Sequence, residues 1–409
     1  MGAMRMQTLN LLVLIGSIGP LAACERSIDF STTGSTWADP PVPAFSSQVR
    51  LVTTNNGDDT LSFVSTDSIA APRLLGTAVI GENPVDLEGP HHLAHSPDGR
   101  WLYYNLSNYV INGGSGPHGA HGSGSLPGYL VKLDARTYRT VGKVLVDRSP
   151  GDVIVSADGK RVFVSHYDLA RFNDQLLKGR PVEEGYSAIA IIDADTMQQL
   201  SLLPICPTAH GEGLSLDQKR LYVTCSLMDE LAVIDVQDPR APQVERRVKI
   251  GPQSGGSGDP RYSPYALIVH PTDGMVWISS TKSNDVRVYD PAQQKMLDGR
   301  TVQVGGSALF GAWSQDKQTL YIPTQNPDQL VAIELATGAT HSLTLPATGC
   351  LNAHAVTLTP LGAAVVCEGD HLVRRGSVVL VDLAHWAIGG TVEIGLFPDS
   401  ATILPSIVD

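Results

Sequence analysis

The stretch Ser96–Tyr104, which reads SPDGRWLYY, decides the fold because its pattern of residue types recurs along the chain. A second copy, SADGKRVFV, occupies Ser156–Val164. In both copies an Asp-Gly pair, which favours a tight turn, lies between two runs of apolar residues. Each copy therefore predicts a β-hairpin of two neighbouring strands.

The same pattern returns four more times, and a third apolar strand that ends on an acidic residue follows each copy. The later turns lie at Asp217, Asp273, Asp316 and the degenerate Thr359–Gly362, and the closing acids are Asp134, Asp193, Asp235, Asp290, Glu334 and Asp382. Apolar residues alternate with period two in these runs, as is typical of strands. Repeats of about 50 residues, each with several short strands, indicate the blades of a β-propeller.

The first copy is incomplete, since Arg50–Asn56 and Thr60–Val64 match only the second and third strands of the repeat. The missing strand is found at the other end of the chain, at Ser400–Leu404. Pairing of these two ends would close a ring and remove the open edge of the sheet. We predict an all-β, seven-bladed β-propeller over residues 48–409, closed by pairing of the C-terminal strand with the first blade.

Three stretches, Arg50–Val64, Pro90–Asn105 and Arg220–Asp235, resemble the YVTN repeat family, also called YncE-like propellers. The resemblance covers nearly all of the chain after its N-terminal segment and implies the propeller fold. Similar propellers serve as surface proteins, lactonases, lyases and dehydrogenase subunits, so the resemblance does not imply one activity. No residue of a known lactonase or lyase site can be carried over to a position of this sequence.

Composition and motifs exclude several functional classes. The 409 residues include 41 acidic and 29 basic side chains, a balance that argues against a nucleic-acid partner. The sequence contains no P-loop, Rossmann glycine set, Gly-x-Ser-x-Gly elbow or His-Glu-x-x-His motif. Without a Cys-x-x-Cys-His motif, covalent haem is not expected either. We therefore expect no nucleotide cofactor, and no catalytic residue is assigned.

The N-terminus predicts export and a membrane anchor. Residues 1–23 have the character of a signal peptide, and Leu21–Cys24 (LAAC) resembles the lipobox of a bacterial lipoprotein. Lipidated Cys24 would anchor the protein at the membrane without a spanning helix, and residues 24–47 would form a flexible tether. The predicted location is the bacterial cell envelope, in the periplasm or on the outer-membrane surface. The alternative is an ordinary signal peptide cleaved after Ala23, which leaves Cys24 as a free thiol.

The other four of the five cysteines fall on equivalent repeat positions. Cys206 and Cys350 precede the first strands of two blades, whereas Cys225 and Cys367 end the second strands of the same blades. In a propeller, the link entering the first strand and the loop leaving the second lie on one face. Because an exported protein occupies an oxidising compartment, we predict the disulfides Cys206–Cys225 and Cys350–Cys367.

Histidines recur where the innermost strands begin. Around the ring, the residues that open these strands are Asp399, His91, Gly151, His210, Tyr265, Leu309 and His354. Imidazoles with a carboxylate suit Zn²⁺, Cu²⁺ or Fe²⁺, so His91, His210, His354 and Asp399 are the candidate metal ligands. His92 is expected to alternate away from the channel. The alternative is that these side chains line a wet channel without a metal.

Taken together, the sequence favours a lipid-anchored binding module of the envelope over an enzyme. It would bind a transition metal or a protein partner, such as an envelope redox or transport protein, on its histidine-bearing face. The alternatives are a metal-assisted hydrolase, an oxidoreductase subunit and a plain docking scaffold. The long loops Asn105–Gly128, with His118 and His121, and His166–Tyr186 would lie on the same face. The first could cap a metal site and the second could dock a partner.

Overall fold

The computed structural model describes residues 50–80, 87–108, 126–255 and 258–404, together with the backbone of the short strands β6 (Val110–Ile111) and β7 (His121–Gly122). The chain divides into two compact units, 1–39 and 40–409, and the second holds every described residue. The expected signal peptide, Cys24 and tether lie outside the described residues. Within the described part, no helix has the length and apolar character needed to cross a membrane.

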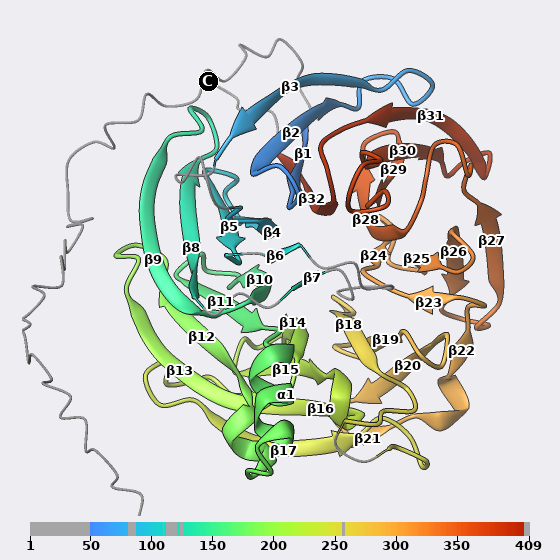
Figure 1. Cartoon of the computed structure of the whole chain (residues 1–409). Coiled ribbons are helices and arrows are strands. Elements are labelled where there is room, and N and C mark those ends of the chain that lie inside the picture. Colours follow the sequence, from blue (N-terminus) through green and yellow to red (C-terminus); the bar gives the residue numbers. More distant parts are fainter. Residues whose placement is uncertain are drawn as a thin grey trace, which may run out of the picture. The chain divides into compact units, whose positions relative to one another are not determined.

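Seven antiparallel sheets are arranged as the blades of a propeller, which confirms the predicted fold (Figure 1). From the channel outward, the first blade contains β32 (Pro398–Leu404), β1 (Arg50–Asn55), β2 (Thr60–Ser65) and β3 (Arg73–Val79). The second contains β4 (Pro90–His95), β5 (Trp101–Leu106), β8 (Pro127–Asp134) and β9 (Thr140–Arg148). The third contains β10 (Pro150–Val155), β11 (Arg161–His166), β12 (Ser187–Asp193) and β13 (Gln199–Cys206).

The fourth blade contains β14 (Ala209–Leu214), β15 (Arg220–Cys225), β16 (Glu230–Asp235) and β17 (Gln243–Lys249). The fifth contains β18 (Pro264–Val269), β19 (Val276–Ser280), β20 (Asp285–Asp290), β21 (Lys295–Met296) and β22 (Val302–Gln303). The sixth contains β23 (Ser307–Ala308), β24 (Ala312–Trp313), β25 (Thr319–Gln325), β26 (Gln329–Glu334) and β27 (Thr340–Thr344). The seventh contains β28 (Ala353–Thr359), β29 (Gly362–Cys367), β30 (Ser377–Asp382) and β31 (Ala387–Glu393).

The ring closes as the sequence predicts, between the two ends of the chain. Strand β32 pairs antiparallel with β1, with Arg50 opposite Leu404 and Val52 opposite Thr402. The first blade therefore takes its innermost strand from the C-terminus and its other three from the N-terminal side. This pairing gives the first blade its fourth strand, so β1 is not left as an open inner edge.

The Ser-x-Asp-Gly motif is explained by the hydrogen bonds of each hairpin turn. In the third blade, the Ser156 hydroxyl donates to Asp158 Oδ1 at 2.6 Å, and the backbone N–H of Arg161 donates to the Ser156 oxygen at 3.0 Å. Gly159 has a φ of +70°, which a residue without a side chain adopts at little cost. The recurring Ser and Asp thus fix the geometry of the turn in the blades that carry both residues.

Aliphatic and aromatic side chains fill the space between neighbouring blades. Between the first and second blades, for example, Val52, Leu61 and Phe63 pack with Leu102 and Tyr104, and all five are at most 2% exposed. The outermost strands are much more exposed, as the pattern of β3 shows. Each blade therefore needs its two neighbours to bury its faces, which makes the ring a single cooperative core.

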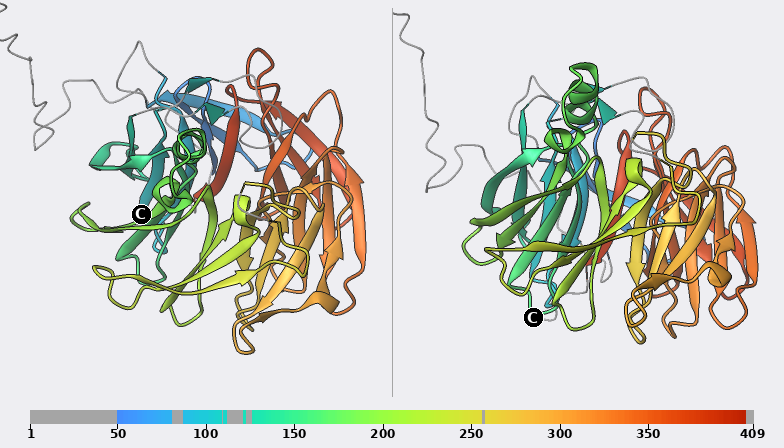
Figure 2. Two further views of the ribbon diagram at one scale, coloured as in Figure 1. Left: turned by 60° about the horizontal axis from the view of Figure 1, so that its bottom comes forward. Right: turned by 90° about the horizontal axis from the view of Figure 1, so that it is seen from below.

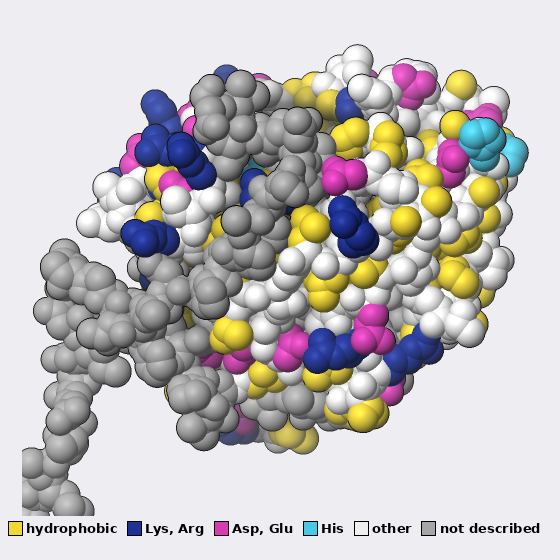
Figure 3. Space-filling view, turned by 90° about the horizontal axis from the view of Figure 1, so that it is seen from above, with side chains coloured by type: hydrophobic (Ala, Val, Ile, Leu, Met, Phe, Trp, Pro, Cys, Tyr) yellow, Lys and Arg dark blue, Asp and Glu magenta, His cyan; other side chains and the backbone are white. Residues whose placement is uncertain are grey.

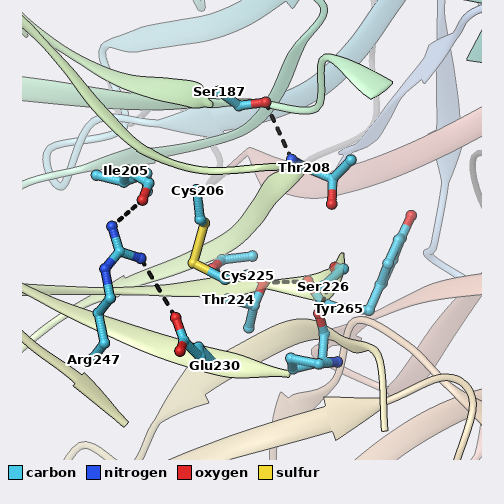
Figure 4. The surroundings of a disulfide bond; sticks show 12 residues. Ser187, Ile205, Cys206, Thr208, Thr224, Cys225, Ser226, Glu230, Arg247 and Tyr265 are labelled. Atoms are coloured by element: carbon cyan, nitrogen blue, oxygen red, sulfur yellow. Dashed lines mark hydrogen bonds and ion pairs between the residues drawn. A yellow bond between two sulfur atoms is a disulfide. The ribbon is translucent and has the colours of Figure 1, made fainter. Parts of the chain in front are cut away.

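Both predicted disulfides are confirmed. Cys206–Cys225 has Cα atoms 5.8 Å apart and Cys350–Cys367 has Cα atoms 5.3 Å apart, both within the range of unforced bridges. Figure 4 shows the first of them beside Thr208 and Thr224, where the Thr224 hydroxyl donates to the Tyr265 carbonyl of the next blade at 2.8 Å. Each bridge ties the start of an innermost strand to the end of the strand beside it.

One insertion forms the helix α1 (Leu169–Leu177) between β11 and β12 of the third blade. It lies on one face of the ring, as both views in Figure 2 show. Asp168 caps its N-terminus by accepting from the Arg171 N–H at 2.9 Å, and this buried carboxylate also pairs with Arg148 at 2.9 Å. The sequence predicts a docking or lid segment here but no helix; the ion pairs hold it against the blade.

Charged side chains of both signs are interspersed with apolar ones on the surface drawn in Figure 3.

The buried His166 gives stability a testable dependence on pH. Burial lowers its pKa from 6.5 to about 4, although the hydrogen bond to the Ala188 carbonyl opposes this shift. Between these two pH values the unfolded chain binds more protons than the folded one, so stability is lost as the pH falls from 6.5 toward 4. His166→Asn keeps a donor for Ala188 but cannot be protonated.

Between pH 7 and pH 4.5 we expect wild type to lose about 2–3 kcal/mol more unfolding free energy than His166→Asn. Urea denaturation of both proteins at the two pH values measures this difference. Equal losses in the two proteins would show that His166 does not carry this dependence.

Candidate metal centre

The innermost strands begin in a way that brings their first side chains together at one end of the channel. The residue before the strand has a positive φ in six blades, from 49° to 60°, at Gly89, Ser149, Thr208, Ser263, Asn352 and Phe397. A bulge follows within the strand, for example between Pro90 and Leu93 and between Ala209 and Glu212. The loops between second and third strands, including α1, lie at the same end by topology.

The bulge changes the role of His92, and the expectation that it alternates away from the channel is wrong. Because a bulge interrupts the two-residue alternation, successive side chains can face the same side. His92 is 3% exposed, and its ring centroid lies 4.6 Å from that of His91 and 5.4 Å from that of His210. His92 is therefore part of the central cluster.

His91, His92 and His210 form one group whose potential ligand nitrogens all lie within 4.8 Å of one another. His91 Nδ1 lies 3.1 Å from the Pro150 carbonyl oxygen, which can only accept, so Nδ1 carries the proton. His92 Nδ1 lies 2.9 Å from Asp152 Oδ1. In the neutral form of each ring, these contacts place the proton on Nδ1 and the lone pair that a metal would bind on Nε2.

The third imidazole, His210, is held by aromatic packing and by a glycine. Its ring stacks on Tyr265 with centroids 4.5 Å apart and an angle of 17°. A Cβ atom at Gly151 would lie 3.2 Å from His210 Cδ2, so the missing side chain in the third blade makes room for this ring. Gly151, which opens the innermost strand of the third blade without a side chain, thus leaves space for His210 of the fourth blade.

His354, Glu368 and Asp399 form a second group of potential ligands, also within 4.8 Å of one another. His354 Nδ1 contacts Glu368 Oε1 and lies 3.5 Å from Asp399 Oδ1. The other oxygen of Glu368 pairs with His371 Nε2 at 2.5 Å. The sequence analysis does not include Glu368 among the candidate ligands. The signal that could have indicated it is its position directly after Cys367, which ends the second strand at the same end of the channel.

The two groups meet where His91 Nε2 lies 3.2 Å from Asp399 Oδ2. Because His91 donates from Nδ1, its neutral ring would present a lone pair to this oxygen, and the two atoms would repel. A proton or a metal cation between them removes the repulsion. All four ligands predicted from the sequence, His91, His210, His354 and Asp399, therefore lie at the same end of the channel, divided between two groups.

Burial sets the protonation of the cluster. It raises the pKa of Asp399 well above its usual range, and the negative charge of Glu368 adds to this effect. Burial would also raise the pKa of Glu368, but its contacts with His354 and His371 outweigh burial and lower that pKa to about 2. For His92, burial lowers the pKa despite the Asp152 carboxylate. Neutral His92 in the first group and ionised Glu368 in the second can each bind a cation.

Aromatic side chains complete the enclosure. In the sixth blade Leu309 is buried, but Phe310 is the residue whose ring contacts the histidines, at 4.6 Å from His92 and 5.6 Å from His354. Glu212, next in the β14 strand after the bulge, is 3% exposed, and burial together with Asp152 raises its pKa well above the usual range. The cluster is thus polar at its centre and screened from water.

Comparisons with known proteins support the fold. No protein-family model and no curated protein matches the sequence. Among solved structures, a functionally unknown protein from Desulfotomaculum acetoxidans DSM 771 aligns with a TM-score of 0.64 at 12% identity, covering 87% of this chain and 99% of that one. The periplasmic gluconolactonase PpgL of Pseudomonas aeruginosa aligns with a TM-score of 0.63 at 15% identity, covering 88% and 99%.

Hydrazine synthase of Kuenenia stuttgartiensis aligns with a TM-score of 0.56 at 18% identity, covering 80% of this chain and 99% of that one. At these identities the similarity establishes a shared propeller architecture, which hosts proteins of different function.

Proposed function

We propose that this chain is a lipid-anchored protein of the bacterial envelope that binds a transition metal ion at the end of its propeller channel. The observation that carries the proposal is the group of three buried imidazoles, His91, His92 and His210, with ligand nitrogens within 4.8 Å of one another. Three neutral imidazoles with a further position for water or another ligand suit Zn²⁺, Cu²⁺ or Fe²⁺.

The hydrogen bonds made by the other ring nitrogens of His91 and His92 support this assignment of ligands. Metal-binding histidines usually donate their other ring N–H to a carboxylate or a backbone carbonyl, which orients the ring. His91 makes such a contact with the Pro150 carbonyl and His92 with Asp152. Among the described residues, His92 Nε2 is buried without a hydrogen bond, which favours a ligand there over a structural role for the ring.

The envelope location and the anchor rest on other features. Two disulfides fit an oxidising compartment, and LAAC at Leu21–Cys24 supports lipidation of Cys24. The resemblance to YVTN repeat proteins agrees with a surface or periplasmic role. Intact-mass measurement of protein from the membrane fraction tests the anchor: a diacylated Cys24 at the new N-terminus supports it, and an unmodified terminus contradicts it.

Zinc titration of purified, metal-stripped protein tests the metal site. Isothermal titration calorimetry is expected to show saturable zinc binding. Absence of binding in folded protein would contradict the proposed function and favour a docking scaffold.

Asp152→Asn is expected to weaken zinc binding by about 10–100-fold, because the neutral amide orients His92 less firmly and lowers its basicity. The matched control is Asp273→Asn, which changes an equivalent pair, His270 Nδ1 to Asp273 Oδ1 at 2.7 Å, away from the cluster. Calorimetry of both variants decides the point. Equal affinities for the two variants would contradict a supporting role for Asp152.

The second candidate is a metal-assisted hydrolase, favoured by the buried acid Glu212 near the three histidines and by the structural neighbour named as a gluconolactonase. Assays of lactone opening with and without added zinc distinguish the candidates. Zinc-dependent turnover that Glu212→Gln abolishes would support the enzyme; binding without turnover supports the binding protein.

A further inference from the structure

We propose that the channel end holds a second metal ion, bound by His354, Glu368 and Asp399, beside the ion on His91, His92 and His210. This inference rests on the proposed function and deepens it, since it assigns a two-metal centre where one ion would satisfy that function.

The distances within the second group suit a metal. His354, Glu368 and Asp399 each offer one ligand atom, and these atoms lie within 4.8 Å of one another. His354 Nδ1 and Asp399 Oδ1 are 3.5 Å apart. Ligands bound at about 2.0–2.2 Å to a tetrahedral ion are separated by about 3.3–3.6 Å. The pair has the spacing of two ligands of one ion, and binding the ion requires His354 Nδ1 to part from Glu368 Oε1, which it contacts here.

The charges of this group also call for a cation. Glu368 is 1% exposed and Asp399 is 0% exposed, and buried carboxylates are costly unless positive charge compensates them. Their ion pairs run to His91, His354 and His371, which are uncharged unless protonated. A divalent ion would compensate the charge of Glu368, and that of Asp399 when it is ionised.

The two groups have no residue in common, and together they supply six donors. A tetrahedral zinc ion uses four ligands, so one ion leaves donors unused. The Phe310 ring contacts both His92 and His354, whose own centroids are 6.1 Å apart. The surplus of donors, three in each group, favours two sites over a single shared one.

The donor sets indicate different preferences for the two ions. The first site is all imidazole, whereas the second has one imidazole and two carboxylates, which suits harder ions such as Fe²⁺ or Mn²⁺ as well as Zn²⁺. His371, which pairs with the second oxygen of Glu368, would orient that carboxylate as a supporting contact.

Native mass spectrometry of the full chain loaded with Zn²⁺ tests the number of ions. We expect two zinc ions per chain in wild type and one in Glu368→Gln. The matched control is Glu334→Gln, which changes an exposed carboxylate that pairs with His341 at 3.4 Å and is expected to retain two ions. His92→Ala is expected to retain one ion, held by the second group.

The outcomes separate this inference from the proposed function. One ion in wild type that survives Glu368→Gln overturns the second site and leaves the first standing. No specifically bound ion in wild type overturns both. One ion in wild type already overturns the two-metal centre even if a variant fails to fold, and the Glu368→Gln and His92→Ala proteins then show which of the two groups holds that ion.

Discussion

Replacing His92 and His210 together with alanine is expected to weaken zinc binding at the first site by more than about 100-fold, a larger loss than removal of a supporting contact causes. Two of three imidazoles of the group are then absent, and His91 alone cannot hold the ion. Calorimetric titration of metal-stripped protein measures the loss, and a competing chelator extends the range to tight binding.

The control for this variant is the pair His341→Ala and His385→Ala, whose side chains are 63% and 80% exposed and lie away from the channel. It removes the same number of imidazoles and is expected to bind zinc as wild type does. Thermal unfolding of the metal-stripped proteins verifies that the double variant is folded. A folded His92→Ala, His210→Ala protein with wild-type affinity would contradict the assignment of the first site.

Removing the disulfide Cys206–Cys225 by double alanine substitution is expected to lower the free energy of unfolding by about 3 kcal/mol. The bridge closes a loop with a sequence separation of 19, and the loss of this restraint increases the entropy of the unfolded chain. Urea denaturation of the variant and wild type, both without metal, measures the difference.

The second bridge, Cys350–Cys367, supplies a matched comparison because it sits at the same repeat positions with a separation of 17. Its removal is expected to have a similar effect on stability. Since Cys206 precedes His210 and Cys367 precedes Glu368, each variant is also expected to weaken the site beside it. Unchanged stability in both variants would show that the ring does not depend on these bridges.

Much of the fold could be predicted from the sequence because the signals are local and repeated. The Ser-x-Asp-Gly turn specifies a hairpin by its own hydrogen bonds, such as that from Ser156 to Asp158. Ring closure followed from an incomplete first copy and a spare strand at Ser400–Leu404, which the pairing of β32 with β1 confirms. The disulfides followed from the same register.

The site could be predicted only in part, because it depends on departures from the regular repeat. His91, His210, His354 and Asp399 share a register, so alignment of the repeats predicts them. The sequence does not predict the place of His92, since a bulge is not visible in an alternating pattern. Glu368, Asp152 and Phe310 belong to the cluster through contacts between blades, and no single repeat carries a signal for them.

The central claim is that a metal ion binds among His91, His92 and His210. X-ray diffraction from zinc-loaded crystals, measured on both sides of the zinc absorption edge, locates the ion directly. We predict an anomalous peak at the channel end, about 2.0–2.1 Å from the Nε2 atoms of His91 and His92 and from a nitrogen of His210. Zinc peaks confined to the outer surface, with none at this end of the channel, would contradict the claim.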